Sequence, residues 1–333
     1  MSATIKLEKE HFPVLLDELI SIISPHYGGT FIDCTFGQGG YSREVLKSKS
    51  NKIIAIDRDK EVLKISKIFE KKYGNRFHFQ NITFKEIDKF KFENNLRGIF
   101  FDLGFSTNQI NDPKKGMSFN SKGKLNMKMG LNYFSAGDAI NKLDVNCLTQ
   151  IFKFFGEEKK AKIISKRIIL ERKKKYLNIE DLIIIIDKAY KGKRKKIHNA
   201  TKVFQALRIF VNQEISQLIH GLINAFKILP VGGVIAVVTF HSLEDKIVKF
   251  FFKNYSEIKN SSRYLPQKLS NLKLFNFSNK KTIFPTKKEI EINPASRSAK
   301  LRYALKINHT EDFSEFIKKF NYFIKIENLY KEL

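Results

Sequence analysis

The chain has 333 residues, of which 42% are hydrophobic, so it can bury a sizeable core in one large domain or two ordinary ones. No stretch reaches the ~18 to 20 uninterrupted apolar residues of a membrane span, and "LIIIID" (182–187) is far too short. The start, "MSATIKLEKEHF", lacks the apolar region of a signal peptide. These absences favour a cytoplasmic protein that has no membrane partner.

The charge balance points to a polyanionic partner. Sixty-one Lys and Arg residues against 34 Asp and Glu residues give a formal net charge of +27, which suits nucleic acid or an anionic membrane face. A compositional bias toward Lys is the alternative, but such a bias should enrich Glu as well. Residues 151–200 hold 16 Lys or Arg and 6 Asp or Glu. Such runs are usually solvated faces, yet in an already basic chain they favour an RNA- or DNA-binding segment.

The first third of the chain alternates apolar runs with helical patterns. "PVLLDELISII" (13–23) predicts a helix with Pro13 in its first turn, and "KEVLKISKIFEKKY" (60–73) predicts another. Near-continuous apolar strands between helices indicate a parallel sheet covered on both faces. The predicted strands are "GTFIDCTF" (29–36), "NKIIAID" (51–57), "RFHFQNITF" (76–84) and "RGIFFDLG" (97–104).

The alternation stops near residue 111 and resumes near residue 201. A Gly-, Lys- and Asn-rich loop and a basic helical stretch come between. The later elements are a helix over 201–226, a strand over 232–240, a helix over 242–255, a strand over 299–307 and an amphipathic helix over 311–333, which we expect to pack on the domain or on a partner subunit. We therefore predict an α/β fold with a mostly parallel sheet. Its parts are a cofactor-binding domain (1–110 and 201–308), an inserted helical, basic substrate-recognition domain (111–200) and a C-terminal helical extension (309–333).

The glycine turn "DCTFGQGG" (33–40) follows the first predicted strand. A dinucleotide fingerprint needs a third glycine, but Ser42 stands at that position, and no G-K-[ST] of a P-loop occurs. Asp57 ends the next strand, where a carboxylate can accept hydrogen bonds from both hydroxyls of a ribose. These features favour a nucleoside ligand without a pyrophosphate, such as S-adenosylmethionine; the alternative is a plain tight turn.

Two further residues follow predicted strands. Phe84 lies where an adenine could stack, although a lone Phe in a chain with 31 is more often part of the core. Asp102 ends an apolar strand, where a bare carboxylate is costly to bury and more plausibly faces a site. Because ligands of parallel sheets bind beyond the carboxyl ends of the strands, we expect these residues to converge.

The positions of the two cysteines bear on which substrate atom would accept a methyl group. Methylation at a pyrimidine C5 needs a thiolate, commonly after a proline, but Cys34 follows Asp33 and Cys147 follows Asn146. An exocyclic amine needs no covalent intermediate. Its usual loop is D/N/S-P-P-aromatic, and "DLGF" (102–105) keeps only the acid and the aromatic. The two cysteines and seven histidines show no metal-ligand spacing, so we expect no structural metal.

Together the motifs resemble the bacterial small-subunit ribosomal RNA (cytosine-N4) methyltransferases of subfamily H, also called MraW. The resemblance implies a class I, Rossmann-like methyltransferase that transfers a methyl group from S-adenosylmethionine to N4 of a cytidine in 16S rRNA at the decoding centre. It also implies the small ribosomal subunit as partner and leaves a homodimer open. The matching stretches are "HFPVLLDELI", "FIDCTFGQGGYSREVL", "AIDRD", "FFDLGFSTNQIND", "KGMSFNSKGKLNMKM", "FGEEKKAKIISKRI", "HNATKVFQALRIFVNQEI", "GGVIAVVTFHSLEDKIVK" and "NPASRSAKLR".

The resemblance also implies cofactor contacts, which fall on Gly39, Gly40, Tyr41, Asp57, Phe84, Asp102 and Gln109. Our own hypothesis for the reaction makes Asp102 and Ser106 the candidate partners of the amine, with His241 as a second candidate. Arg208, Arg297 and Arg302 are either phosphate contacts or structural ion pairs.

The chain departs from the family pattern at several positions. Tyr41 stands where His is usual, which alters a side-chain contact. Lys124, Asn126 and Lys128 replace residues of the usual P-L-D-M-R-M, which alters a substrate contact of that loop. The alternatives are a methyltransferase on another RNA amine, a non-catalytic RNA-binding assembly factor, a nucleotide-binding oxidoreductase and a membrane-surface protein.

Overall fold

The computed structural model groups the chain into two compact units. Unit 1 comprises Met1–Gly104 and Ile223–Glu311, and unit 2 comprises Phe105–Leu222 and Asp312–Leu333. No helix in the part that the structure describes is both long and apolar enough to cross a bilayer. The described residues are 13–89, 95–105, 109–110, 112–121, 123–130, 132–192, 198–257, 273–277, 282–310 and 312–332.

Unit 1 is built on a seven-stranded sheet with the order β3-β2-β1-β4-β5-β7-β6. The four pairings from β3 to β5 are all parallel, whereas β7 pairs antiparallel with both β5 and β6. This confirms the predicted mostly parallel, Rossmann-like sheet. The strands are β1 (Gly29–Asp33), β2 (Asn51–Ile56), β3 (Phe77–Gln80), β4 (Leu96–Asp102), β5 (Val234–Thr239), β6 (Phe275–Asn276) and β7 (Lys300–Lys306).

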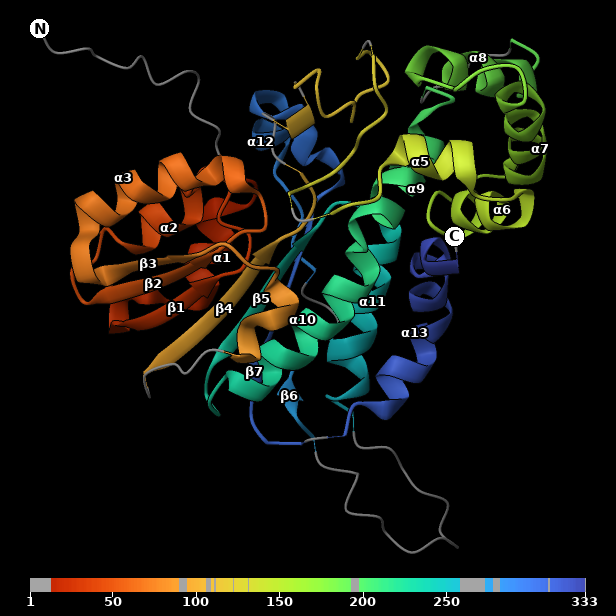
Figure 1. Ribbon diagram of the computed structural model, residues 1–333. Helices are drawn as coiled ribbons and strands as arrows, with labels where there is room; N and C mark the ends of the chain where they lie inside the picture. The colour runs from red at the N-terminus through yellow and green to blue at the C-terminus, as the bar shows by residue number, and fades with distance from the viewer. Residues whose placement is uncertain are drawn as a thin grey trace, which may run out of the picture. The chain divides into compact units, whose positions relative to one another are not determined.

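Helices of unit 1 pack along this sheet, as Figure 1 shows. Helix α3 contacts β3, α2 contacts β2, and α11 contacts β5 and β7. Strand β1 is buried along its whole length, which explains its uninterrupted apolar sequence. The helices are α1 (Leu16–Ile23), α2 (Gly40–Val45), α3 (Leu63–Tyr73), α11 (Ser242–Asn254) and α12 (Lys287–Ile292), and α10 (Glu214–Ile228) begins in unit 2 and ends in unit 1.

The strand order reverses between β1 and β4, which are neighbours in the sheet. Asp33 pairs with Ala55 of β2 and with Phe100 of β4, so the last residues of these strands lie at the same edge. Asp102, the last residue of β4, pairs in turn with Val238 of β5. The acidic residues found at strand ends in the sequence therefore meet at the topological switch point, where ligands of such sheets bind.

Unit 2 is helical. Helix α6 contacts α7, α9 and α13, and α5 contacts α7 and α9. The complete helices are α5 (Ala136–Lys142), α6 (Val145–Phe154), α7 (Ala161–Arg172), α8 (Ile179–Ala189), α9 (Thr201–Asn212) and α13 (Ser314–Glu327).

Two of the predicted helices differ in the structure. The single helix predicted over 201–226 is wrong, because Gln213 adopts a left-handed conformation (φ 50°) that separates α9 from α10. The helix predicted from Pro13 begins only at Leu16, since Leu15 is also left-handed (φ 55°). Neither residue is a glycine, so the sequence carried no signal for these conformations.

The C-terminal helix α13 packs within unit 2, where it contacts α6 and α9. Phe316, Phe320 and Ile326 are buried in its apolar face. Glu327 is buried as well and accepts hydrogen bonds from the backbone N–H groups of Ile215 and Ser216, each at 2.8 Å, and from the Ser216 hydroxyl. The Glu327 side chain, at the end of α13, thereby caps the first turn of α10.

Replacement of Glu327 by Gln tests this cap. Burial raises the pKa of Glu327 to about 8, although the three hydrogen bonds lower it. The folded protein therefore takes up a proton at Glu327, and the wild type should lose stability as pH rises from about 5 to 8, by about 1.4 kcal/mol per pH unit. Urea unfolding should show that the free energy of unfolding of wild type falls relative to that of Glu327→Gln over this range, because only the wild type titrates at this position.

The matched control is Glu315→Gln, which changes an exposed residue of the same helix. Its stability difference from wild type should stay constant with pH. A difference between wild type and Glu327→Gln that is equally independent of pH would contradict the assigned protonation.

Candidate functional site

The glycine turn begins directly after β1 and leads into α2. Gly37 and Gly39 have φ values of +51° and +71°, which only glycine adopts readily. A Cβ at Gly39 would lie 2.5 Å from the Phe69 ring, and one at Gly40 would lie 2.2 Å from Pro13. These two glycines are thus required by packing inside unit 1. Gly37 is different, because a Cβ there would meet only the Thr35 carbonyl, at 3.8 Å.

Asp57 follows β2 and is held against the glycine turn. Its Oδ2 accepts a hydrogen bond from Gly37 N–H and its Oδ1 accepts one from Asp59 N–H, both at 2.8 Å. The Asn81 side chain, which follows β3, donates to the Asp57 carbonyl at 2.8 Å. Burial raises the pKa of Asp57 to about 6, against these two backbone hydrogen bonds. Each carboxylate oxygen keeps a lone pair with which to accept a hydroxyl proton.

Asp33 ends β1 and is completely buried. Ser42 Oγ donates to its Oδ2 at 2.7 Å, and Thr35 N–H donates to its Oδ1 at 3.2 Å. Burial, with a smaller contribution from the charge of Asp57, raises the pKa of Asp33 to about 7, although the hydrogen bonds from Ser42 and Thr35 lower it. Sequence reasoning did not single out Asp33 as a site residue, although its position at the end of an apolar strand was the available signal.

Asp102 ends β4 on the other side of the switch point. Its backbone N–H donates to Thr35 Oγ1 at 2.7 Å, which ties the end of β4 to the turn after β1. Its Oδ1 is buried and accepts no hydrogen bond from any residue that the structure describes. Burial raises the pKa of Asp102 well above its ordinary value, and the charges of Asp33 and Glu244 raise it further. A buried polar atom without a partner is costly, so it marks a place for a ligand.

Asp33, Asp57 and Asp102 lie at the carboxyl ends of neighbouring strands of the sheet. We call this set of three carboxyl groups the acidic edge. Burial destabilises the ionised form of each group. In two of them the charge of another member of the set also raises the pKa: Asp57 acts on Asp33, and Asp33 acts on Asp102. Hydroxyl donors or a positive charge brought to this edge would stabilise the ionised forms. The arrangement therefore suits a ligand that carries a ribose and a cationic centre.

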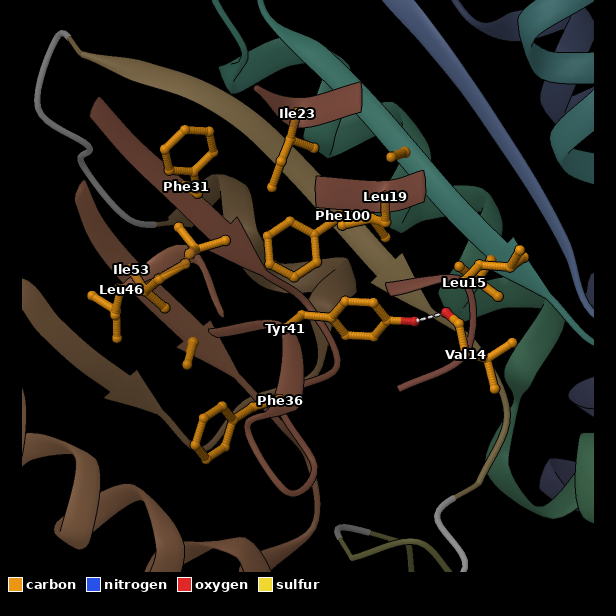
Figure 2. Close-up of a cluster of buried hydrophobic side chains, with 14 of the residues drawn as sticks. Val14, Leu15, Leu19, Ile23, Phe31, Phe36, Tyr41, Leu46, Ile53 and Phe100 are labelled. Atoms are coloured by element: carbon orange, nitrogen blue, oxygen red, sulfur yellow. Dashed lines mark hydrogen bonds between the residues drawn. The ribbon is translucent and has the colours of Figure 1, made fainter. Parts of the chain in front are cut away.

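Tyr41 lies in the core of unit 1, as Figure 2 shows. Its side chain is buried, its ring packs 5.9 Å from that of Phe100, and its hydroxyl donates to the Val14 carbonyl. Burial raises the pKa of Tyr41 well above its ordinary value. The Tyr41 side chain therefore serves core packing. The cofactor contact predicted for Tyr41 would have to be made by its backbone.

Three other predicted residues occupy different surroundings. Phe84 opens a short 3-10 helix and packs edge-on against Phe101, with ring centroids 5.4 Å apart. Gln109 belongs to unit 2, and its predicted cofactor contact stays a prediction. Ser106 lies outside the described residues.

His241, the second catalytic candidate, is the N-cap of α11. Its Nδ1 accepts a hydrogen bond from Glu244 N–H at 3.3 Å, while Glu244 Oε2 accepts from the N–H groups of Phe240 and His241. His241 Nε2 lies 3.1 Å from Glu244 Oε1. Since Nδ1 accepts a hydrogen bond, the tautomer assigned to the neutral ring carries its proton on Nε2. This capping box gives His241 a structural role at the end of β5.

Two of the three arginines form ion pairs. Arg208 Nε and a terminal nitrogen each lie 2.9 Å from the carboxylate oxygens of Glu214, and Arg302 Nε lies 2.6 Å from Asp245 Oδ1. Both guanidinium groups are therefore engaged in structural pairs. Arg297 is exposed.

The substrate loop predicted around "KGKLNMKM" is anchored within unit 2 by Asn212. The Asn212 amide accepts from Met129 N–H at 2.8 Å and donates to the Met127 carbonyl at 2.8 Å. Met127 is itself left-handed (φ 57°). Of the three departures from the family pattern, Lys124 is exposed, whereas Asn126 and Lys128 are half-buried.

Comparison with known proteins decides the family. The sequence pattern of the family described as the MraW methylase family matches residues 8–307. The chain belongs to the MraW methylase family.

Relatives of this MraW methylase are similar over nearly their whole length. A protein of Orientia tsutsugamushi (strain Ikeda) named "Ribosomal RNA small subunit methyltransferase H" is 41% identical over 307 residues, which cover 90% of this chain and 98% of the relative. Proteins of the same name from Brucella ovis and Agrobacterium fabrum are 37% and 39% identical, and the alignments cover 92% or more of each chain. The match of 8–307 leaves the helix α13 outside the family pattern.

Replacement of Asp102 by Asn should stabilise this MraW methylase in its free form. Because its folded pKa is raised, the wild type loses stability as pH rises above the ordinary carboxyl pKa, whereas Asn is indifferent to pH. We expect the variant to gain about 1 to 3 kcal/mol in free energy of unfolding between pH 5 and pH 8, relative to wild type. Urea unfolding at both pH values measures this.

Asp245→Asn is the control, because it replaces a carboxyl group whose pKa is lowered rather than raised. Burial would raise the pKa of Asp245, but hydrogen bonds from Arg302 and Lys300 outweigh it and lower the pKa. Its loss should therefore destabilise the protein at both pH 5 and pH 8. If Asp102→Asn destabilises the protein as Asp245→Asn does, then interactions in the free protein already compensate for the burial of the Asp102 carboxylate.

Proposed function

We propose that this protein transfers the methyl group of S-adenosylmethionine to N4 of a cytidine in 16S rRNA at the decoding centre of the small ribosomal subunit. The observation that carries the proposal is the buried Asp102 Oδ1, which lacks a partner among the described residues at the switch point of the sheet. Membership of a methylase family and relatives named for small-subunit ribosomal RNA support the reaction and the substrate class.

The acidic edge fits the cofactor. Asp57 would accept hydrogen bonds from the ribose hydroxyls, as its two oxygens are already oriented by Gly37 and Asp59. Gly37 leaves open space beside the backbone, so that a ligand can approach closely. The negative charge of Asp33 and Asp102 complements a sulfonium. Phe84, Gly39, Gly40, the Tyr41 backbone and Gln109 remain proposed contacts.

Asp102 would orient the target amine. The lone pair of an exocyclic cytosine amine is delocalised into the ring, so a hydrogen bond from the amine to a carboxylate increases its nucleophilicity. Bound S-adenosylmethionine supplies an activated methyl group. Asp102 Oδ1 accepts the amine N–H and then holds the proton that leaves nitrogen, for which its raised pKa is suited. Thr35 fixes the backbone of Asp102 throughout.

The thiols favour nitrogen over carbon as the acceptor. Cys34 is buried, and burial raises the pKa of its thiol well above the ordinary value, an effect that the charge of Asp33 increases. A thiol of this kind is a poor nucleophile. Covalent attack on a pyrimidine ring is therefore disfavoured at the only cysteine of unit 1.

Unit 2 would bind the RNA. Its segment 151–200 carries 16 Lys or Arg residues against 6 Asp or Glu residues, and Lys162 and Lys166 of α7 and Lys173 at its C-cap are exposed. Phosphate contacts of this kind hold an RNA without reading its sequence. The target cytidine must be unpaired to present its amine, which favours the small subunit as the substrate form.

One experiment tests the proposal directly. The protein is incubated with labelled S-adenosylmethionine and small ribosomal subunits from a strain that lacks the enzyme, and the labelled nucleoside is mapped by mass spectrometry. We expect label on N4 of one cytidine in 16S rRNA. Label on a ring carbon, on a ribose or on protein would refute the amine assignment, and binding of subunits without any transfer would favour an assembly factor.

Asp57→Asn tests the cofactor contact. We expect the affinity for S-adenosylmethionine, measured by calorimetry, to fall about 10- to 100-fold, since a charged hydrogen bond is worth about 1.5 to 3 kcal/mol. Hydroxyl donors favour the ionised carboxyl, so wild-type affinity should also fall as pH drops below about 6, the pKa of Asp57. The variant should lack this dependence.

Asp59→Asn is the matched control, because it makes the same chemical change two residues away. Asp59 accepts a hydrogen bond from Glu61 N–H at 3.0 Å as the cap of a 3-10 helix, and Asn is also a good N-cap. Its affinity should stay within about twofold of wild type. Equal losses in both variants would mean that Asp57 supports the fold rather than the ribose.

A further inference from the structure

Tyr133 is the most exposed large hydrophobic or aromatic side chain that the structure describes. It is 98% exposed, compared with 88% for Tyr27 and 66% for Tyr176. A single exposed aromatic residue is common and needs no special explanation. The surroundings of Tyr133 are unusual because the residues on both sides of it are fixed within unit 2.

The residue before Tyr133 is held by the Asn212 anchor. Asn132 Nδ2 donates to Asn212 Oδ1 at 2.7 Å, and the same oxygen accepts from Met129 N–H. Asn212 is completely buried, and its own amide donates to the carbonyls of Met127 and Arg208. The position of Asn132 is thus set by helix α9.

The residues after Tyr133 are held by stacking and by a helix cap. The Phe134 ring stacks on Tyr330 with centroids 5.5 Å apart and meets Phe210 edge-on at 6.1 Å. The Tyr330 hydroxyl accepts from Gln213 Nε2 at 3.0 Å. Ser135 then caps α5 through a capping box with Asp138. With both neighbours fixed, Tyr133 projects its ring to solvent from a backbone that loses little further entropy when the ring binds.

The segment around Tyr133 is positively charged. Residues 112–134 contain five lysines and one acidic residue, and the segment is tied together by hydrogen bonds such as Met127 N–H to the Lys115 carbonyl at 2.6 Å. An exposed aromatic residue in a lysine-rich segment is an arrangement that suits single-stranded nucleic acid, since bases stack on the ring and phosphates meet the cations.

We propose that Tyr133 is a nucleobase-stacking residue for an unpaired base of the substrate RNA, presented by Asn212 on one side and by Tyr330 of the C-terminal segment on the other. This inference rests on the proposed function, because it assigns a contact to the RNA that the enzyme would methylate. It adds a substrate-binding role for a residue outside the acidic edge and a supporting role for a segment outside the family pattern.

Steady-state kinetics with small subunits test the role in binding. Tyr133→Ala should raise KM for the subunit about 5- to 100-fold, with kcat and the affinity for S-adenosylmethionine unchanged. Tyr133→Phe keeps the ring and should stay within about twofold of wild type. The matched control is Tyr27→Ala, which removes another highly exposed tyrosine, from unit 1. A wild-type KM for Tyr133→Ala would overturn the inference.

The absence of tryptophan from the chain allows a direct test of stacking. Tyr133→Trp introduces a unique fluorophore, and a protein-free fragment of 16S rRNA should quench its emission upon binding. Tyr27→Trp should show no such quenching. Equal quenching in both variants, or loss of subunit binding by Tyr133→Ala with unchanged binding of the protein-free RNA, would overturn base stacking in favour of a protein contact.

Failure of the inference is distinct from failure of the proposed function. If wild type transfers no methyl group to RNA, the proposed function fails. If wild type is active and Tyr133→Ala matches it, the function stands and Tyr133 is an ordinary surface residue.

Discussion

Desolvation of three carboxyl groups at one edge of a sheet is the constraint on which this protein depends. Asp33, Asp57 and Asp102 end or follow neighbouring strands, and burial raises the pKa of each. Parallel strands deliver their carboxyl ends to the same edge, so the topology itself gathers the acids. Hydrogen bonds from Ser42, Thr35 and Gly37 offset part of the cost. The Asp102 Oδ1 atom, which has no hydrogen-bond partner among the described residues, keeps an unfavourable free energy of burial that a bound ligand can reduce.

The glycine turn beside this edge is closely packed. Gly39 and Gly40 have no room for a side chain because Phe69 and Pro13 fill the space, and Tyr41 closes the core by donating to Val14. Thr35 bonds to both sides of the switch point, through its N–H to Asp33 and its hydroxyl to the backbone of Asp102. Small movements of the turn would therefore shift two carboxyl groups together.

Three side chains fix the positions of separate segments within unit 2. Asn212 holds the loop around Met127, Glu327 caps α10, and Tyr330 supports Phe134. Two of these three residues belong to the C-terminal segment, which lies beyond the matched residues 8–307. The segment thus adds contacts to the unit that carries the densest positive charge, which links a feature outside the family pattern to the substrate-binding side of the proposed reaction.

The sequence by itself predicted β1 to β5 and β7, the mostly parallel sheet and the acidic residues Asp57 and Asp102, whereas it carried no signal for the two-residue strand β6. These depend on local apolar runs and on the rule that parallel strands end at one edge. Only the tertiary structure decided that Tyr41 is a core residue, that His241 is a helix cap and that Arg302 is paired with Asp245. It also decided the break at Gln213 and the support of Tyr133. The reason is physical: burial, hydrogen bonding and left-handed backbone depend on partners that are distant in the chain, such as Asn132 and Asn212.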